Sequence, residues 1–116
     1  MRISEQKLNP SLKKQINITL SQTICDLNST QEASEFLSDF FTPSELETFA
    51  KRLAIGYWLQ KGRSYSNIKD NLKVSSATIA TVQNMLNLKG FQLALKKANA
   101  DEWAQKWSEK IKKYLH

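Results

Sequence analysis

The chain has 116 residues, 41% of them hydrophobic and 24% charged, with a net charge of +6, which fits one ordinary globular domain over residues 1–116. The single cysteine, Cys25, excludes an internal disulfide, and neither it nor the single histidine has the neighbours that a metal site requires. The first residues lack the apolar core of a signal peptide and no run approaches the ~18 apolar residues of a membrane span, so we expect a cytoplasmic protein with no membrane partner.

The first part of the chain carries clear helix-start signals. Asn9 supplies an N-cap and Pro10 a first-turn proline, and apolar residues then recur at helical spacing, which predicts a helix over about 10–28. Ser29 followed by Glu32 forms a capping box for a short second helix with an apolar, phenylalanine-rich face.

A stronger start signal opens the third predicted helix. Thr42 can accept a hydrogen bond from the N–H of Glu45, and Pro43 lies where no N–H is needed. Gly62 is a suitable residue to follow a helix that ends near Lys61. The apolar positions expected to face a core are Leu46, Phe49, Ala50, Leu53, Tyr57 and Leu59.

Residues 64–87 have the spacing of a helix-turn-helix. Ser64 can cap the first helix, Val74 fills the turn, and Ser75 can cap the second helix. The apolar residues that recur at one-turn spacing are Ile68 and Leu72 in the first helix and Ile79, Val82 and Leu86 in the second. This pattern fits the unit that presents its second helix to a DNA major groove, although helix pairs with short turns also occur in purely structural bundles.

Two lysines depart from the usual helix-turn-helix pattern. Lys73 occupies the turn position that commonly holds a left-handed glycine, so either the turn differs or it is strained by about 1 kcal/mol or more. Lys69 stands where a small residue would let the two helices approach closely. Its long stem can extend outward, which would bring its ammonium group near a DNA phosphate.

The region 30–95, and most clearly the part from Glu35 to Leu95, resembles the tryptophan-repressor-like family. The residues that match the family pattern, with one residue deleted after Gly62, are Thr42-Pro43, Glu45, Glu47, Arg52, Gly62, Ile68, Leu72, Ala77, Thr78, Ile79, Asn84 and Leu86. The resemblance implies an all-α, multi-helix fold. It also implies an intertwined homodimer built on the N-terminal helices and a helix-turn-helix in each subunit that binds operator DNA.

The best-known members of that family bind free tryptophan, and the matching residues here are incomplete. Thr42 and Arg52 match family positions near the ligand. However, Thr81 stands where a stacking arginine is expected, and Met85 where a serine contacts the amino group. Losing the guanidinium removes interactions of roughly 1.5 to 3 kcal/mol, so we expect no useful affinity for tryptophan. The sequence identifies no other small-molecule effector.

Arg52 has a simpler alternative role outside ligand binding. Two acidic residues precede it on the same predicted helix, Glu45 and Glu47. We expect Arg52 to form an exposed or interhelical ion pair with one of them.

The second helix of the motif carries short, uncharged side chains, which favour close approach to base edges and contacts to A·T pairs. The candidate DNA-binding residues on this helix and at its start are Ser75, Ser76, Ala77, Thr78, Ala80, Thr81 and Asn84. The candidates for phosphate contacts outside it are Arg63, Lys69, Lys73 and Lys89. For Thr81 and Asn84 the alternative is simple solvent exposure.

Residues 99–116 are predicted to form an amphipathic basic helix that begins at a cap formed by Asn99 and Glu102. Its apolar stripe contains Trp103, Trp107, Ile111 and Tyr114 or Leu115, and its basic face contains Lys106, Lys110, Lys112 and Lys113. We expect the stripe to pack on the same domain or on a partner subunit rather than on a membrane. The lysines could extend a DNA-binding surface.

The positive charge is concentrated in the second half of the chain. Residues 1–62 hold seven basic and seven acidic side chains, whereas residues 63–116 hold ten and four. This asymmetry indicates an anionic partner, with nucleic acid ahead of a membrane surface, and a solvated basic helix face is the alternative.

No pattern in the chain indicates catalysis or a cofactor. It has no phosphate-cradling glycine loop and no cysteine–histidine pair at a usable spacing, so we expect no enzyme. The sequence predicts a sequence-specific, repressor-like transcriptional regulator, a homodimer that reads double-stranded DNA with helix 76–87. The alternative is a helical homodimer that binds another protein through its tryptophan stripe.

Overall fold

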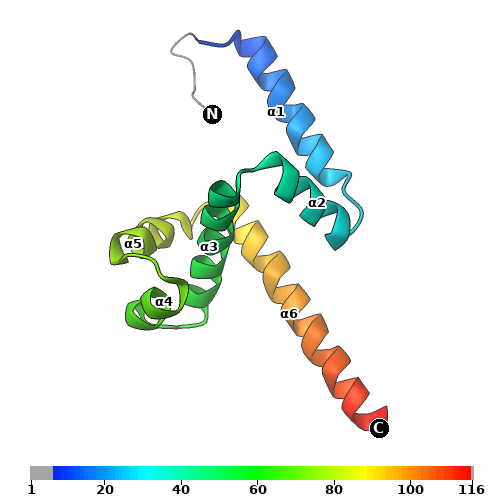
Figure 1. Ribbon diagram of the computed structural model, residues 1–116, viewed down its shortest axis with the longest axis vertical. Helices are drawn as coiled ribbons and strands as arrows, with labels where there is room; N and C mark the ends of the chain where they lie inside the picture. Colours follow the sequence, from blue (N-terminus) through cyan, green and yellow to red (C-terminus); the bar gives the residue numbers. More distant parts are fainter. Residues whose placement is uncertain (1–6, 116) are drawn as a thin grey trace. The chain divides into compact units, whose positions relative to one another are not determined.

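The computed structural model describes residues 7–115, with side chains described through residue 102, and this part of the chain consists of six α-helices without a strand (Figure 1). The predicted all-α fold is therefore confirmed. The chain divides into two compact units, residues 1–43 and 44–116.

The first unit contains α1 (Pro10–Cys25) and α2 (Thr30–Phe40). Both begin at the predicted caps, because the Asn9 side chain accepts a hydrogen bond from the Ser11 N–H (2.9 Å) and Ser29 Oγ accepts one from the Glu32 N–H (3.1 Å). Helix α1 ends three residues earlier than expected, since the backbone leaves helical geometry before it reaches the extended cap residue Ser29.

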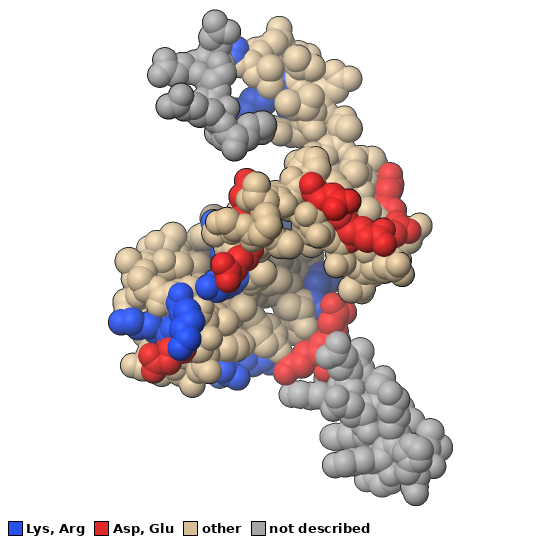
Figure 2. Space-filling model, in the orientation of Figure 1, with Lys and Arg blue, Asp and Glu red and all other residues tan. Residues whose placement is uncertain are grey.

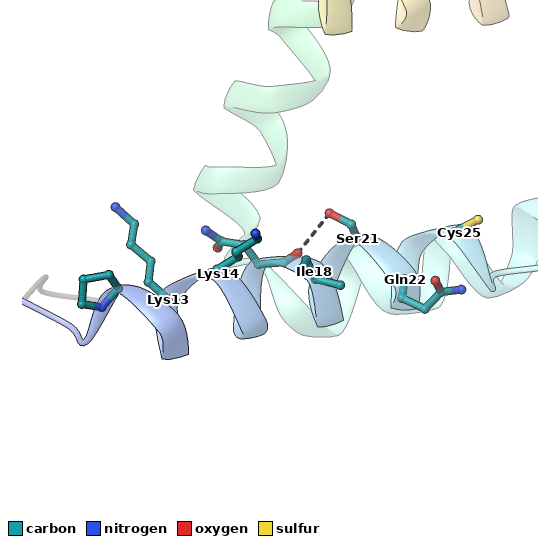
Figure 3. A pocket seen from close by; sticks show the side chains of 8 residues that line it. Lys13, Lys14, Ile18, Ser21, Gln22 and Cys25 are labelled. Carbon is teal, nitrogen blue, oxygen red and sulfur yellow. Dashed lines mark hydrogen bonds between the residues drawn. The ribbon is translucent and has the colours of Figure 1, made fainter.

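Helix α1 exposes both of its faces. Its apolar stripe is 41–52% exposed and consists of Leu12, Ile16, Leu20 and Ile24. The opposite face holds a shallow groove in which Lys13, Lys14, Ser21 and Gln22 surround Ile18, and the Ser21 hydroxyl donates to the Asn17 carbonyl oxygen at 3.0 Å (Figure 3). That groove is lined by one helix only, so we assign it no function.

The second unit contains the rest of α3 (Pro43–Gln60), followed by α4 (Tyr65–Leu72), α5 (Ser76–Met85) and α6 (Lys89–Leu115). Its core is a cluster of buried aliphatic side chains from three helices, Ile55, Ile68, Ile79 and Val82. The half-buried residues packed around this cluster are Trp58, Leu59, Tyr65, Leu72, Val74 and Phe91. Helices α4 and α5 thus pack their apolar faces against α3.

The sequence predicted the wrong face of α3 to meet the core. Phe49 and Leu53 are each 40% exposed and Ala50 is exposed, whereas Ile55 and Gly56 are the buried residues of this helix. Helix α3 carries apolar residues on two opposite sides, and α4 and α5 cover the side that bears Ile55. On the other side Phe49 and Leu53 are exposed, whereas Leu46 and Tyr57 are half-buried.

Helix α6 runs without interruption from Lys89 to Leu115. The new cap predicted at Asn99 is not present, because Asn99 lies inside this helix and its side-chain amide donates to the Leu95 carbonyl at 3.0 Å. The predicted stripe that begins at Trp103 and the lysines opposite it lie outside the residues whose side chains are described.

Among the described residues, none of the helices combines the length and the apolar character needed to cross a membrane.

Candidate DNA-binding site

The junction between α3 and α4 is closed by a glycine-dependent helix end. Gly62 adopts a left-handed conformation (φ 81°), its N–H donates to the Leu59 carbonyl (3.1 Å), and the Arg63 N–H donates to the Trp58 carbonyl (3.1 Å). These paired bonds form a Schellman motif. Ser64 then starts α4, since its Oγ accepts a hydrogen bond from the N–H three residues on. The start of α4 is thereby held at the end of α3.

The turn between α4 and α5 is strained at Lys73. Its φ of 56° and ψ of 51° lie in the left-handed region, and it is the one non-glycine residue with positive φ in the part of the chain that the structure describes. Its N–H donates to the Lys69 carbonyl at 2.9 Å. The turn therefore follows the usual helix-turn-helix course, with the strain that the sequence predicts for a lysine at this position.

Helix α5 is packed and capped as the motif requires. Ser75 is extended and its Oγ accepts a hydrogen bond from the Thr78 N–H at 3.1 Å. The buried Ile79 and Val82 face the core, and the Tyr65 hydroxyl is hydrogen-bonded to the side-chain oxygen of Gln83, which ties α4 to α5. Helices α4 and α5 together form a helix-turn-helix (Figure 1).

The remaining face of α5 is exposed and uncharged. The exposed residues at its start and along this helix include every position predicted there to bind DNA: Ser75, Ser76, Ala77, Thr78, Ala80, Thr81 and Asn84. The Thr81 hydroxyl donates to the Ala77 carbonyl at 3.0 Å, so its proton is used within the helix. The side chains here are short, with methyl and hydroxyl groups and the Asn84 carboxamide, which permits a close approach to base edges; the nearby Gln83 carboxamide is engaged by Tyr65.

Of the four residues predicted to contact phosphates, Arg63 is the one whose charged group is engaged by neighbouring side chains. All four are exposed: Lys69 lies in the last turn of α4, Lys73 in the turn before α5, Lys89 at the start of α6 and Arg63 just before α4. The Arg63 guanidinium lies 4.0 Å from the centroid of the Trp58 ring and donates to Asn67 Oδ1 at 3.3 Å. Figure 2 shows Lys and Arg side chains grouped on the surface of the α4–α5 region, with an acidic side chain among them.

A cleft of about 420 Å³ lies between α3 and the start of α5. The residues that line it are Glu47, Thr48, Lys51, Arg52, Ile55, Lys73, Val74, Ser75, Thr78, Thr81 and Val82. Arg52, Thr78 and Thr81 thus share one hollow, and Ala77, Ala80 and Asn84 are exposed elsewhere on α5.

Arg52 was predicted to pair with Glu45 or Glu47, and the structure records a different partner for Glu47. The Glu47 carboxylate lies 3.6 Å from Lys51 Nζ, one helical turn away, and the Arg52 guanidinium lies 5.3 Å from the centroid of the Phe49 ring. Residues four apart on a helix are neighbours, which favours the Lys51 partner.

Two contacts of the motif were not predicted. The stacking of Arg63 on Trp58 follows from the Schellman motif, which brings residues at these two positions together. Because Gly62 indicates such a motif, the sequence did contain a signal for this contact. The contact between Tyr65 and Gln83 joins residues 18 apart in the sequence, and no spacing rule predicts it.

The fold and the exposed second helix of the motif place the chain in the class of all-α helix-turn-helix proteins. The sequence profile of the family described as Trp repressor protein matches residues 15–99, and the chain belongs to this family. It is a family of regulators rather than enzymes, and membership indicates a DNA-binding function.

One curated relative is YerC of Bacillus subtilis (strain 168), which is itself described as uncharacterized. It is 29% identical over 85 residues, which are 72% of this chain and 82% of YerC. No solved structure matches the chain. The family match begins at residue 15, within α1, and ends at residue 99, so residues 100–116 lie beyond it.

Replacing Lys73 by glycine should stabilise the protein. Lys73→Gly relieves the left-handed strain and should raise the free energy of unfolding by about 1 kcal/mol, measured by urea denaturation at a fixed protein concentration. Lys73→Ala removes the same charge but retains a β-carbon, so it should give no comparable gain. Equal stability of the two variants would contradict strain at this turn.

Proposed function

We propose that this protein is a sequence-specific DNA-binding transcriptional regulator that acts as a dimer and does not respond to tryptophan. The observation that carries the proposal is the exposed, uncharged outer face of α5, held away from the core by buried Ile79 and Val82. Because no long side chain projects from this face, the helix backbone can lie deep in a major groove.

The side chains of this face favour A·T-containing sites. The Ala77 and Ala80 methyl groups can contact the methyl group of thymine, and the Asn84 carboxamide can pair with adenine. Helix α5, all of whose residues are described, contains no Lys or Arg, so it cannot form the contact between arginine and guanine. Much of the sequence preference should therefore come from the shape and deformability of the DNA.

The binding energy has to come mainly from phosphates beside the groove. Lys69 and Lys73 are exposed where α4 leads into α5, and Lys89 is exposed beyond the other end of α5. Each can neutralise a phosphate and release a counterion. Arg63 is the weakest candidate of the four, since a phosphate would have to compete with Trp58 and Asn67 for its guanidinium.

The dimer is supported by the open apolar surface of α1. None of the described residues of α1 and α2 is buried, and the stripe formed by Leu12, Ile16, Leu20 and Ile24 is uncovered in the single chain. Burying such a stripe against a second copy would stabilise both chains. A two-fold dimer would present two copies of α5 to an inverted repeat.

The alternative function is a helical dimer that binds another protein and does not read DNA. Two features favour it: the strained turn at Lys73 and the absence of charge on α5. Both functions use the α1 surface, so dimerisation does not distinguish them. Selection of specific DNA sequences does distinguish them, because only the first function requires it.

The proposed function is tested by selection from a pool of random DNA duplexes at two salt concentrations. We expect enrichment of an A·T-containing inverted repeat, because two copies of α5 would read two half-sites. Enrichment should persist at the higher salt concentration, although overall affinity falls. Weak binding that disappears with salt and enriches no sequence would favour the protein-binding alternative.

The cleft between α3 and α5 should not bind tryptophan. It offers Arg52 and Lys51 for a carboxylate, but Thr81 lines it in place of a guanidinium that could stack on an indole ring. Isothermal titration calorimetry should detect no binding at micromolar tryptophan, and the duplex selected above should bind equally with and without it. A micromolar dissociation constant would contradict this assignment.

A charge within the α1 stripe should disrupt the dimer. Ile16→Asp places a carboxylate among the apolar side chains of the stripe, so sedimentation at micromolar concentration should show monomers. Asn17→Asp, next to it on the polar side, adds the same charge and should leave the dimer intact. Dissociation of both variants, or of neither, would show that the stripe is not the dimer interface.

A further inference from the structure

We infer that Gly56 is a positioning residue that sets where the reading helix α5 lies, an inference that rests on the proposed function. Gly56 is buried in the interior of α3. Glycine is a poor helix former and was not predicted to matter here, so its presence at a buried helical position needs a packing reason.

The packing reason is the ring of Phe91. A β-carbon on residue 56 would lie 2.4 Å from Cε1 and 2.8 Å from Cζ of Phe91, and 3.5 Å from Cδ2 of Leu86. The first two distances are far below van der Waals contact, so the ring occupies the space that a side chain at position 56 would need. Phe91 also packs against the core cluster of the unit.

Phe91 and Leu86 belong to the corner that ends α5 and begins α6. The Gln92 side-chain amide donates to the Leu86 carbonyl, the Leu88 N–H donates to the Met85 carbonyl (3.0 Å), and the Gln92 N–H donates to the Leu88 carbonyl (2.9 Å). These bonds make the corner a connected unit, which leads from α5 into α6 (Figure 1). A shift of Phe91 would therefore move the end of α5 relative to α3.

Such a shift should affect sequence reading more than phosphate binding. Base contacts from Ala77, Ala80 and Asn84 depend on the position of α5, whereas Lys69 and Lys73 lie before this helix and remain on the surface. Affinity for the selected duplex should fall while affinity for a scrambled duplex is retained.

The test compares Gly56→Ala with Gly90→Ala, each assayed well below its unfolding temperature. Gly90 is the matched control, because a β-carbon there would have no atom within 4 Å. We expect Gly56→Ala to reduce the ratio of selected to scrambled affinity at least tenfold, with scrambled affinity within twofold of wild type, and Gly90→Ala to leave the ratio unchanged. Phe91→Leu added to Gly56→Ala removes the clashing ring atoms and should restore most of the ratio.

An unchanged ratio in Gly56→Ala, or a folded double variant with the ratio still low, would overturn the inference. If Gly56→Ala does not fold, the double variant decides: recovery of folding and of the ratio supports positioning, and continued unfolding shows a role in stability alone.

A second readout needs no DNA. The backbone amide NMR signals of residues 77–84, along α5 and away from both substitutions, should shift in Gly56→Ala and not in Gly90→Ala, and unchanged signals would overturn the inference. A wild-type protein that enriches no sequence would contradict the proposed function, and the NMR comparison would still decide the role of Gly56.

Discussion

The helix-turn-helix depends on one buried aliphatic cluster. In it, Ile55 of α3 packs with Ile68 of α4 and with Ile79 and Val82 of α5. Ile55, Ile68 and Ile79 are fully buried, and burial of such a side chain contributes about 1.5–3 kcal/mol. The two helices of the motif cannot bury their apolar faces on each other alone, so α3 completes their core. Once Ile79 and Val82 face inward, the 3.6-residue period of the helix turns Ala77, Ala80 and Asn84 outward.

In the proposed function, this arrangement would separate sequence reading from charge. The outer face of α5 carries small, uncharged groups, and exposed lysines occur before it, at Lys69 and Lys73, and after it, at Lys89. Short side chains lose little entropy on contact with bases, whereas phosphates are bound by longer side chains at the edges of the groove. A lysine in the left-handed turn position costs stability, but it adds a cation directly before the reading helix.

The sequence predicted most helix starts and the turn, because these depend on local chemistry. Asn9, Ser29, Ser64 and Ser75 cap the helices that follow them, and the left-handed conformation fell on Lys73 as the motif indicated. In each case a side chain bonds to the backbone two or three residues away, or the turn geometry itself imposes the conformation.

The parts that could not be predicted depend on which surfaces meet. Spacing alone could not decide between the two apolar sides of α3, and it favoured the side of Phe49 and Leu53 over the side of Ile55. The contact of Gly56 with Phe91 joins residues of two different helices, so no local rule indicates it. The side-chain roles at the DNA surface remain proposals, since exposure alone does not distinguish a base contact from a solvated residue.

The central claim is that the outer face of α5 lies against DNA bases, and photo-crosslinking tests it most directly. Ala80→Cys, in a Cys25→Ser background, would carry an aryl azide at the centre of this face, and Gln31→Cys on α2 would carry the same group as a control. With the duplex enriched by selection, we expect the azide at position 80 to crosslink to bases within each half-site and the azide at position 31 to give no specific crosslink. Efficient binding without a base crosslink from position 80, or with equal crosslinks from both positions, would contradict the assignment of α5 as the reading helix.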